Sequence, residues 1–136
     1  MAKLKLEIVT PEAKIYSDDV DTVVLPGSEG DLGPLPEHAP LLTALSAGEL
    51  HVMKDGKETV LAVGEGFVEI TPTMVSVLTD MAVAESDIDE TAAEAAIKRA
   101  QEALKDDQIS DEDMASAQAV MMKSLAQLKV KRRRKI

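Results

Sequence analysis

Glycine and proline disappear partway along this chain, and that change limits what each part can fold into. All seven glycines and all six prolines lie before Ser86, whereas alanine is the commonest residue from there to the end. Glycine and proline interrupt helices, and alanine has the highest helix propensity. The pattern predicts two domains: a turn-rich β domain over residues 1–86 and a helical domain over residues 87–136.

The first segment contains short runs in which apolar and polar residues alternate, as in β-strands with one solvent-exposed face. One run begins at Leu4, and others cover residues 13–25, interrupted by a polar stretch, and residues 74–83. Asp55 and Gly56 separate two further runs, and this pair favours a type I′ hairpin, which needs positive φ at both positions. Short strands with frequent turns predict a β-sandwich or a barrel.

A glycine- and proline-rich stretch over residues 27–45 joins two of these candidate strands. It contains three glycines, three prolines and one of the two histidines. No packed helix tolerates this composition, and the stretch ends in apolar residues that a flexible linker would lack. We predict an ordered acidic bend that presents Glu29, Asp31, Glu37 and His38 to something outside the domain.

The second segment contains two candidate helices with recognisable ends. Asp87, with Glu90 three positions later, fits the N-cap of the first helix and its partner in the first turn. Residues 106–110 end that helix, and either Ser110 or Asp111 caps the second. A connection this short predicts an antiparallel helical hairpin.

Each predicted helix carries one apolar stripe. The stripe of the first helix consists of Ala93, Ile97, Ala100 and Leu104. The stripe of the second helix consists of Met114, Ala117, Met121, Leu125 and Leu128. Because alanine buries little apolar area, we expect a hairpin that docks weakly and opens at low energetic cost.

Charge is distributed unevenly along the chain, whose net charge is −10. The basic residues of the carboxyl-terminal tip, which contains no acidic residue, are Lys129, Lys131, Arg132, Arg133, Arg134 and Lys135. Two interpretations stay open: a solvated helix end favoured by the helix dipole, or a contact with an acidic protein surface. Nucleic-acid binding is disfavoured, since the rest of the chain is acidic and lacks aromatic residues for base stacking.

Residue patterns that carry out catalysis are missing from the sequence. No phosphate-binding loop lysine follows the glycines, there is no cysteine, and no catalytic or metal-ligand spacing surrounds His38 or His51. We expect a chain that is not an enzyme by itself and that has no metal or cofactor. Tyr16 and Phe67 are the sole aromatic residues, so the core must be aliphatic. No apolar run approaches the ~20 residues of a membrane span, so direct membrane insertion is not expected.

Several motifs nevertheless resemble one family closely. They are the glycine-rich residues 27–33, the Pro-Glu-His-Ala-Pro-Leu-Leu-Thr run at 36–43, residues 6–11, residues 64–67 and the closing residues 125–128. Together they are similar to the epsilon subunit of bacterial F-type ATP synthase over essentially the whole chain. The resemblance implies a sandwich of about ten short strands followed by an antiparallel two-helix hairpin.

This resemblance also implies a function and two partners. Epsilon subunits are non-catalytic rotor subunits of the proton-translocating synthase, and they bind the gamma subunit and the membrane c-ring through the β domain. The implied location is peripheral, on the cytoplasmic face of the bacterial plasma membrane. Carried over by position, the residues that face the c-ring are Glu29, Gly30, Asp31 and His38.

For the helical domain, the resemblance implies a regulatory role. The hairpin of this family opens and restrains ATP hydrolysis, and its basic tip then contacts the catalytic beta and alpha subunits transiently. Some members bind ATP through a motif that aligns here with Asp113 and Ala117. Ser116 replaces the arginine of that motif, so we predict weak or absent nucleotide binding.

One alternative function stays open at the level of the sequence. A free-standing β-sandwich that binds proteins, with a nucleotide-sensing helical hairpin, has the same pattern of elements. Co-purification with a gamma subunit separates the two, because a free module does not need a rotor partner.

Overall fold

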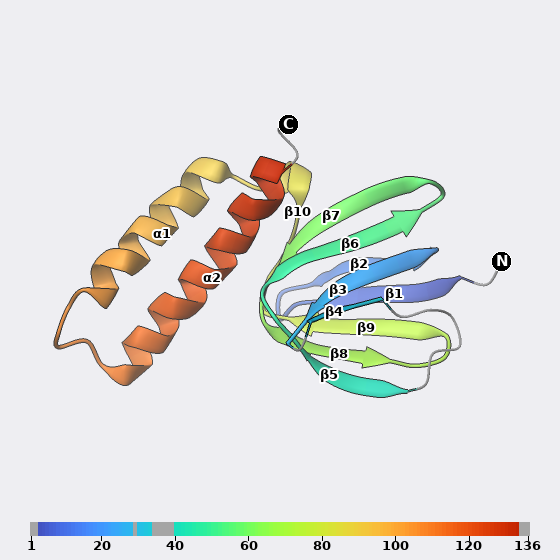
Figure 1. The fold of residues 1–136 in the computed structure, drawn as a ribbon, viewed down its shortest axis with the longest axis horizontal. Helices are drawn as coiled ribbons and strands as arrows, with labels where there is room; N and C mark the ends of the chain where they lie inside the picture. The colour runs from blue at the N-terminus through green and yellow to red at the C-terminus, as the bar shows by residue number, and fades with distance from the viewer. Residues whose placement is uncertain (1–2, 29, 34–39, 134–136) are drawn as a thin grey trace.

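The computed structural model describes residues 3–28, 30–33 and 40–133, which form a layered β domain followed by two helices (Figure 1). Within these residues the strands are β1 (Leu4–Val9), β2 (Lys14–Val20), β3 (Thr22–Gly27), β4 (Gly30–Leu32), β5 (Leu41–Leu45), β6 (Gly48–Lys54), β7 (Lys57–Val63), β8 (Gly66–Ile70), β9 (Met74–Thr79) and β10 (Ala82–Ala84). A 3-10 turn (Glu85–Asp87) leads to α1 (Glu90–Leu104) and α2 (Asp111–Arg133). The predicted fold class, a β-sandwich followed by a helical hairpin, is confirmed.

The strands are joined in the order β10-β7-β6-β3-β5-β8-β9-β1-β2, and β4 pairs with β3 off this path. β3 belongs to both layers, because Val23 pairs with Val52 of β6 whereas Gly27 pairs with Leu45 of β5. β1 and β9 run parallel, and the other described pairs are antiparallel. The sheet therefore folds over at β3 and encloses one core.

That core is aliphatic, as the scarcity of aromatic residues predicted. Its buried members are Leu4, Leu6, Ile8, Val20, Val23, Leu25, Leu45, Leu50, Val52, Leu61, Val63, Val68, Ile70, Val75 and Val77. Alternate residues of each strand supply these side chains, as the two-residue period of a β-strand requires.

β7 departs from this alternation because it is buried on both faces. Leu61 and Val63 point into the sandwich core. Val60 and Ala62 lie on the opposite face and pack in a second cluster with Val130 of α2. The sheet thus has one outer surface that the hairpin covers, at β7, while α2 lies between α1 and the sandwich (Figure 1).

Two predicted strands are each divided in the structure. Residues 13–25 form β2 and β3, separated at Asp21, and residues 74–83 form β9 and the start of β10. The polar stretch expected to interrupt the first strand lies inside β2, an edge strand whose acidic residues face water. There, Lys54 of β6 hydrogen-bonds Asp18 and lowers the pKa of its carboxyl group. The hairpin at Asp55 and Gly56 is confirmed, with φ of 51° and 79°.

The predicted N-cap is confirmed for α2 and is wrong for α1. Asp89, rather than Asp87, caps α1, because its carboxylate accepts a hydrogen bond from the Ala92 amide at 3.0 Å. Asp87 lies in the preceding 3-10 turn. Ser110 caps α2 by accepting from the Asp113 amide at 3.0 Å.

The predicted apolar stripes are only partly buried. In α1, Ala93 and Ala100 are buried, while Ile97 and Leu104 are half-buried. In α2, Ala117 and Leu128 are buried and Met121 is half-buried, but Met114 and Leu125 are exposed. The prediction of a single stripe was wrong for α2 because this helix packs against two neighbours, α1 on one side and β7 on the other.

Candidate binding surface

An exposed apolar surface covers the outer face of β5, β8 and β9. Phe67 and Leu78 lie directly opposite each other in the β8–β9 register, and they are 58% and 54% exposed. Ala44 of β5 and Val9 of β1 continue the same row across the sheet. Leu42 of β5, 68% exposed, lies two residues from Ala44 along β5 and therefore on the same face. We call these five residues the apolar surface.

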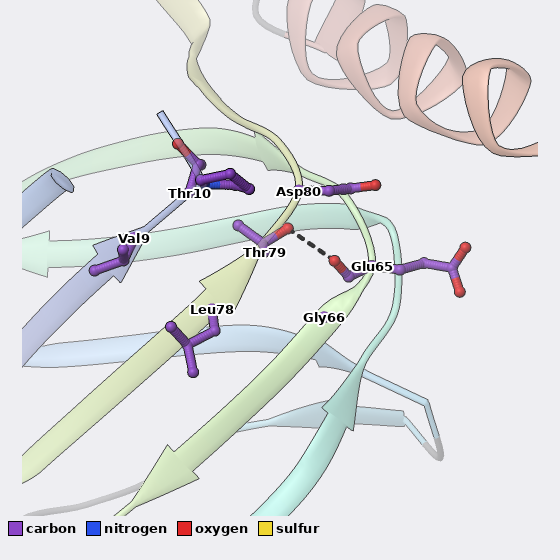
Figure 2. Close-up of a pocket in the computed structure, with 8 residues that line it drawn as sticks. Val9, Thr10, Glu65, Gly66, Leu78, Thr79 and Asp80 are labelled. Atoms are coloured by element: carbon purple, nitrogen blue, oxygen red, sulfur yellow. Dashed lines mark hydrogen bonds between the residues drawn. The ribbon is translucent and has the colours of Figure 1, made fainter. Parts of the chain in front are cut away.

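A groove borders the apolar surface at the end of β9 (Figure 2). It has a volume of about 360 Å³, and its lining residues are Val9, Thr10, Pro11, Glu65, Gly66, Leu78, Thr79 and Asp80. Figure 2 shows the side chains of Glu65 and Asp80 extending away from Val9 and Leu78. The floor of the groove is therefore apolar, and the carboxylates stand at one rim.

Close backbone packing shapes this groove. A Cβ added to Gly66 would lie 1.9 Å from the carbonyl oxygen of Leu78, so no larger residue fits there. The hydroxyl of the buried Thr79 donates a hydrogen bond to the Glu65 carbonyl at 3.1 Å and accepts one from the Met81 amide at 3.4 Å (Figure 2). The backbones of β8 and β9 are thus closely packed beside Phe67 and Leu78.

The predicted c-ring residues are placed only in part. Gly30 and Asp31 lie in β4 and are exposed, whereas Glu29 and His38 lie outside the described residues. Asp31 lines a second, polar groove of about 430 Å³, together with Lys129 of α2. Two residues that sequence reasoning had assigned to separate sites therefore border the same groove.

Lys129, Lys131 and Arg132 of the predicted basic tip are engaged at the base of the hairpin. Lys129 pairs with Glu49 of β6 at 3.6 Å, and Lys131 donates a hydrogen bond to the Glu85 carbonyl at 3.4 Å. Arg134 and Lys135 lie outside the described residues, and Arg133 ends α2. In this conformation Lys129 and Lys131 contact the β domain and the 3-10 turn instead of projecting freely.

Arg132 joins the two helices. Its Nε donates to Glu90 at 2.9 Å, and its Nη2 donates to Glu94 at 2.6 Å. The hydrogen bond that Arg132 donates to Glu90, followed by the one that it donates to Glu94, raises the pKa of the guanidinium group. Arg132 is therefore cationic throughout the physiological pH range.

The candidate nucleotide residues lie in the first turns of α2. Asp113 and Ser116 are exposed, and Ala117 is buried. The first turn carries Asp111, Glu112 and Asp113, and no basic residue occurs between positions 111 and 122. Among the described residues, no group of histidine, cysteine or carboxylate side chains is arranged to hold a metal ion. This segment offers a triphosphate three repelling carboxylates and no cation.

We expect isothermal titration calorimetry of the full chain with ATP and magnesium to show a dissociation constant no lower than about 1 mM. That value corresponds to a binding free energy of about −4 kcal/mol. Replacing Ser116 with arginine restores one cation to the motif and should strengthen binding measurably. Gln118→Arg adds the same charge two positions away and serves as the control. Micromolar affinity of the unmodified chain would contradict this prediction.

No helix among the described residues is long and apolar enough to cross a membrane. The apolar surface is formed by strand residues of the two-layer β domain. A contiguous exposed apolar surface on such a domain commonly marks a protein–protein interface.

Comparison with known proteins extends over nearly the whole chain. The ATP synthase delta/epsilon chain beta-sandwich domain matches residues 3–85, and the long alpha-helix domain of the same family matches residues 86–132. The ATP synthase epsilon chain of Herpetosiphon aurantiacus is 42% identical over 97% of this chain and 96% of its own length. That of Dehalococcoides mccartyi is 43% identical over 99% of this chain and 96% of its own length.

A solved structure has the same fold at low sequence identity. A chain in the cryo-EM structure of the Euglena gracilis mitochondrial ATP synthase superimposes with a TM-score of 0.76 at 20% identity, covering 95% of this chain and 81% of that one. The β-sandwich followed by two helices agrees with the two family domains that match the chain. The chain belongs to the epsilon-chain family of ATP synthase subunits.

Proposed function

We propose that this protein is the central-stalk subunit that couples the c-ring to gamma in a bacterial, proton-translocating ATP synthase, and that its hairpin restrains ATP hydrolysis. As an epsilon chain, it is a non-catalytic subunit of the synthase. Its contribution is therefore mechanical and regulatory. The sandwich acts as a rigid spacer between two partners, and the hairpin acts as a movable element.

The apolar surface carries the proposal. It lies on β5, β8 and β9, whereas α2 docks on β7 in the other layer (Figure 1). It thus stays accessible while the hairpin is docked. An exposed phenylalanine facing an exposed leucine supplies the kind of apolar anchor that interface hot spots use. We assign this surface to gamma.

A second, chemically different surface suits the c-ring. β4 exposes Gly30 and Asp31 on a short strand within the acidic bend, and Glu29 and His38 lie on either side of this strand in the sequence. A polar contact on this side and an apolar contact on the other let the two partners share the binding free energy. The implied location is peripheral, on the cytoplasmic face of the plasma membrane, through the c-ring.

The dimensions of the hairpin suit a reach along the stalk. At 1.5 Å per residue, α1 spans roughly 22 Å and α2 roughly 35 Å. An opened hairpin therefore reaches well beyond the docked one. We assign the basic residues of α2 to a transient contact with acidic segments of the catalytic beta and alpha subunits.

Removing residues 87–136 tests the regulatory part of this function. The assembled synthase carrying only the sandwich should hydrolyse ATP at least about fivefold faster, the lower end of typical coupling between sites. A shorter deletion of residues 129–136 should give most of this increase if the basic residues make the inhibitory contact. An unchanged rate in a complex that still contains the truncated subunit would contradict the regulatory role.

A further inference from the structure

We propose that the carboxyl-terminal half of α2 is an ionic latch, in which Lys123, Lys129 and Arg132 hold the hairpin closed so that salt opens it. The latch deepens the proposed function, and it rests on that function insofar as the hairpin must leave the sandwich to act. The closed hairpin of Figure 1 is then held by ion pairs in addition to apolar burial.

The apolar contact between hairpin and sandwich is small. The partly buried Met81 and Val83 pack against the buried cluster beneath α2, and among the described residues that cluster consists of Ala126 and Val130 of α2 with Val60, Ala62 and Ile88. Two of these five side chains are alanines, which contribute little apolar area. The buried side chains of α1 are Ala93 and Ala100. Apolar packing alone therefore holds the hairpin weakly.

The ion pairs gather at one end of the hairpin. Lys123 pairs with Asp80 beside the Figure 2 groove, and Lys129 pairs with Glu49, whose side chain is only 9% exposed. Arg132 bridges Glu90 and Glu94 of α1. Among the described residues, α2 makes these pairs from Lys123 onward and makes none in its first half. The turn between the helices is therefore left unlatched.

The latch joins parts that otherwise carry the same sign of charge. The carboxylates that it contacts, Glu49 and Asp80, belong to the sandwich, and Glu90 and Glu94 belong to α1. The basic side of α2 lies between these two acidic parts. Without Lys129 and Arg132, Glu49 of the sandwich and Glu90 and Glu94 of α1 would lose the α2 cations that attract them, and Lys123 would remain paired with Asp80.

Salt dependence distinguishes a hairpin held closed by ion pairs from one held closed by apolar packing. At 0.15 M salt the Debye length is about 8 Å, so long-range repulsion between the acidic parts is already screened. Raising the salt to 1 M shortens it to about 3 Å, which is comparable to the pair distances of the latch. Between these two concentrations the main change is a weaker latch, and the hairpin should open. Apolar contacts do not weaken in sodium chloride.

The test uses single-molecule energy transfer in the full chain. Since the chain contains no cysteine, dyes can be attached specifically to S116C on α2 and K57C at the β6–β7 turn, both exposed positions. The measured quantity is the ratio of open to closed hairpin. We expect R132Q to raise this ratio about threefold at 0.15 M sodium chloride, and K129Q about twofold. Effects of this size are typical for the loss of a partly exposed ion pair.

Three controls make the result decisive. R99Q removes an equal charge from an exposed position of α1 outside the latch and should leave the ratio unchanged. R132K keeps the cation and should restore most of the closed state. E94Q should raise the ratio, and its combination with R132Q should add less than the two single effects, since both remove the same pair. Circular dichroism checks that the helices persist.

Two outcomes overturn the latch: R132Q and K129Q behaving like R99Q, or an open fraction that does not rise between 0.15 M and 1 M salt. Either result would show that apolar packing closes the hairpin. Because these measurements use the free chain, they do not depend on ATP hydrolysis. If the free chain opens as expected but deletion of the hairpin leaves ATP hydrolysis by the synthase unchanged, the regulatory function is refuted and the latch is still supported.

Discussion

Replacing Leu78 with aspartate should weaken binding to the gamma subunit at least about 30-fold, which corresponds to about 2 kcal/mol. Leu78 lies at the centre of the apolar surface, opposite Phe67 on one side and Val9 on the other. A carboxylate there would be buried without a partner when gamma binds, next to the acidic rim at Glu65 and Asp80. Folding of the free chain should change little, since Leu78 is 54% exposed.

Leu125 offers a matched control for this substitution. It is a leucine with similar exposure, 49%, but it lies on α2, away from the apolar surface. L125D should change the affinity for gamma less than about threefold, the range of surface substitutions outside an interface. Both variants are compared by calorimetry against purified gamma. Equal losses in the two variants would mean that the apolar surface is not the gamma interface.

The second large effect is expected for Gly66→Ala, which should destabilise the sandwich by about 3 kcal/mol. The new Cβ would lie 1.9 Å from the Leu78 carbonyl oxygen and 2.9 Å from the Thr79 Cα. Both are backbone atoms, so no side-chain rotation relieves the contact and β8 must move away from β9. The melting temperature should fall by roughly 10 °C or more.

Gly33→Ala is the control for that variant, because nothing lies within 4 Å of a Cβ at Gly33. Its effect should stay within about 0.5 kcal/mol, as for substitutions that touch nothing. Thermal unfolding followed by circular dichroism measures both variants. If the Gly66 variant has the same melting temperature as the wild type, the tight approach of β8 and β9 is not required for the fold.

Local patterns predicted most of the fold. The β6–β7 hairpin followed from Asp55 and Gly56, because the conformation of a two-residue turn depends on those residues alone. The strand break near Asp80 was missed, because it is made by the Thr79 hydroxyl, which bonds to Glu65. The cap was misplaced because Asp87, with Glu90 three positions later, fits the capping pattern, whereas Asp89 is followed at that spacing by Ala92. The 3-10 turn takes up Asp87 and leaves Asp89 at the start of the helix.

The binding surface was harder to predict than the fold. Alternation shows that Phe67 and Val68 face opposite sides of β8, but it does not show which side is buried. The available signal was that Val68 and Ile70 share a period with the core, which leaves Phe67 outside. The ion pairs of α2 lay beyond any local pattern, because Lys129 and Glu49 are far apart in the sequence.

Titration of the full-length protein with the purified gamma subunit of its own synthase tests the central claim most directly. The rotor assignment predicts an equimolar complex with a dissociation constant below about 10 μM, and loss of that complex in L78D. The same titration with L125D should reproduce the wild-type curve. A correctly folded chain that shows no heat of binding and no co-elution with gamma would contradict the assignment.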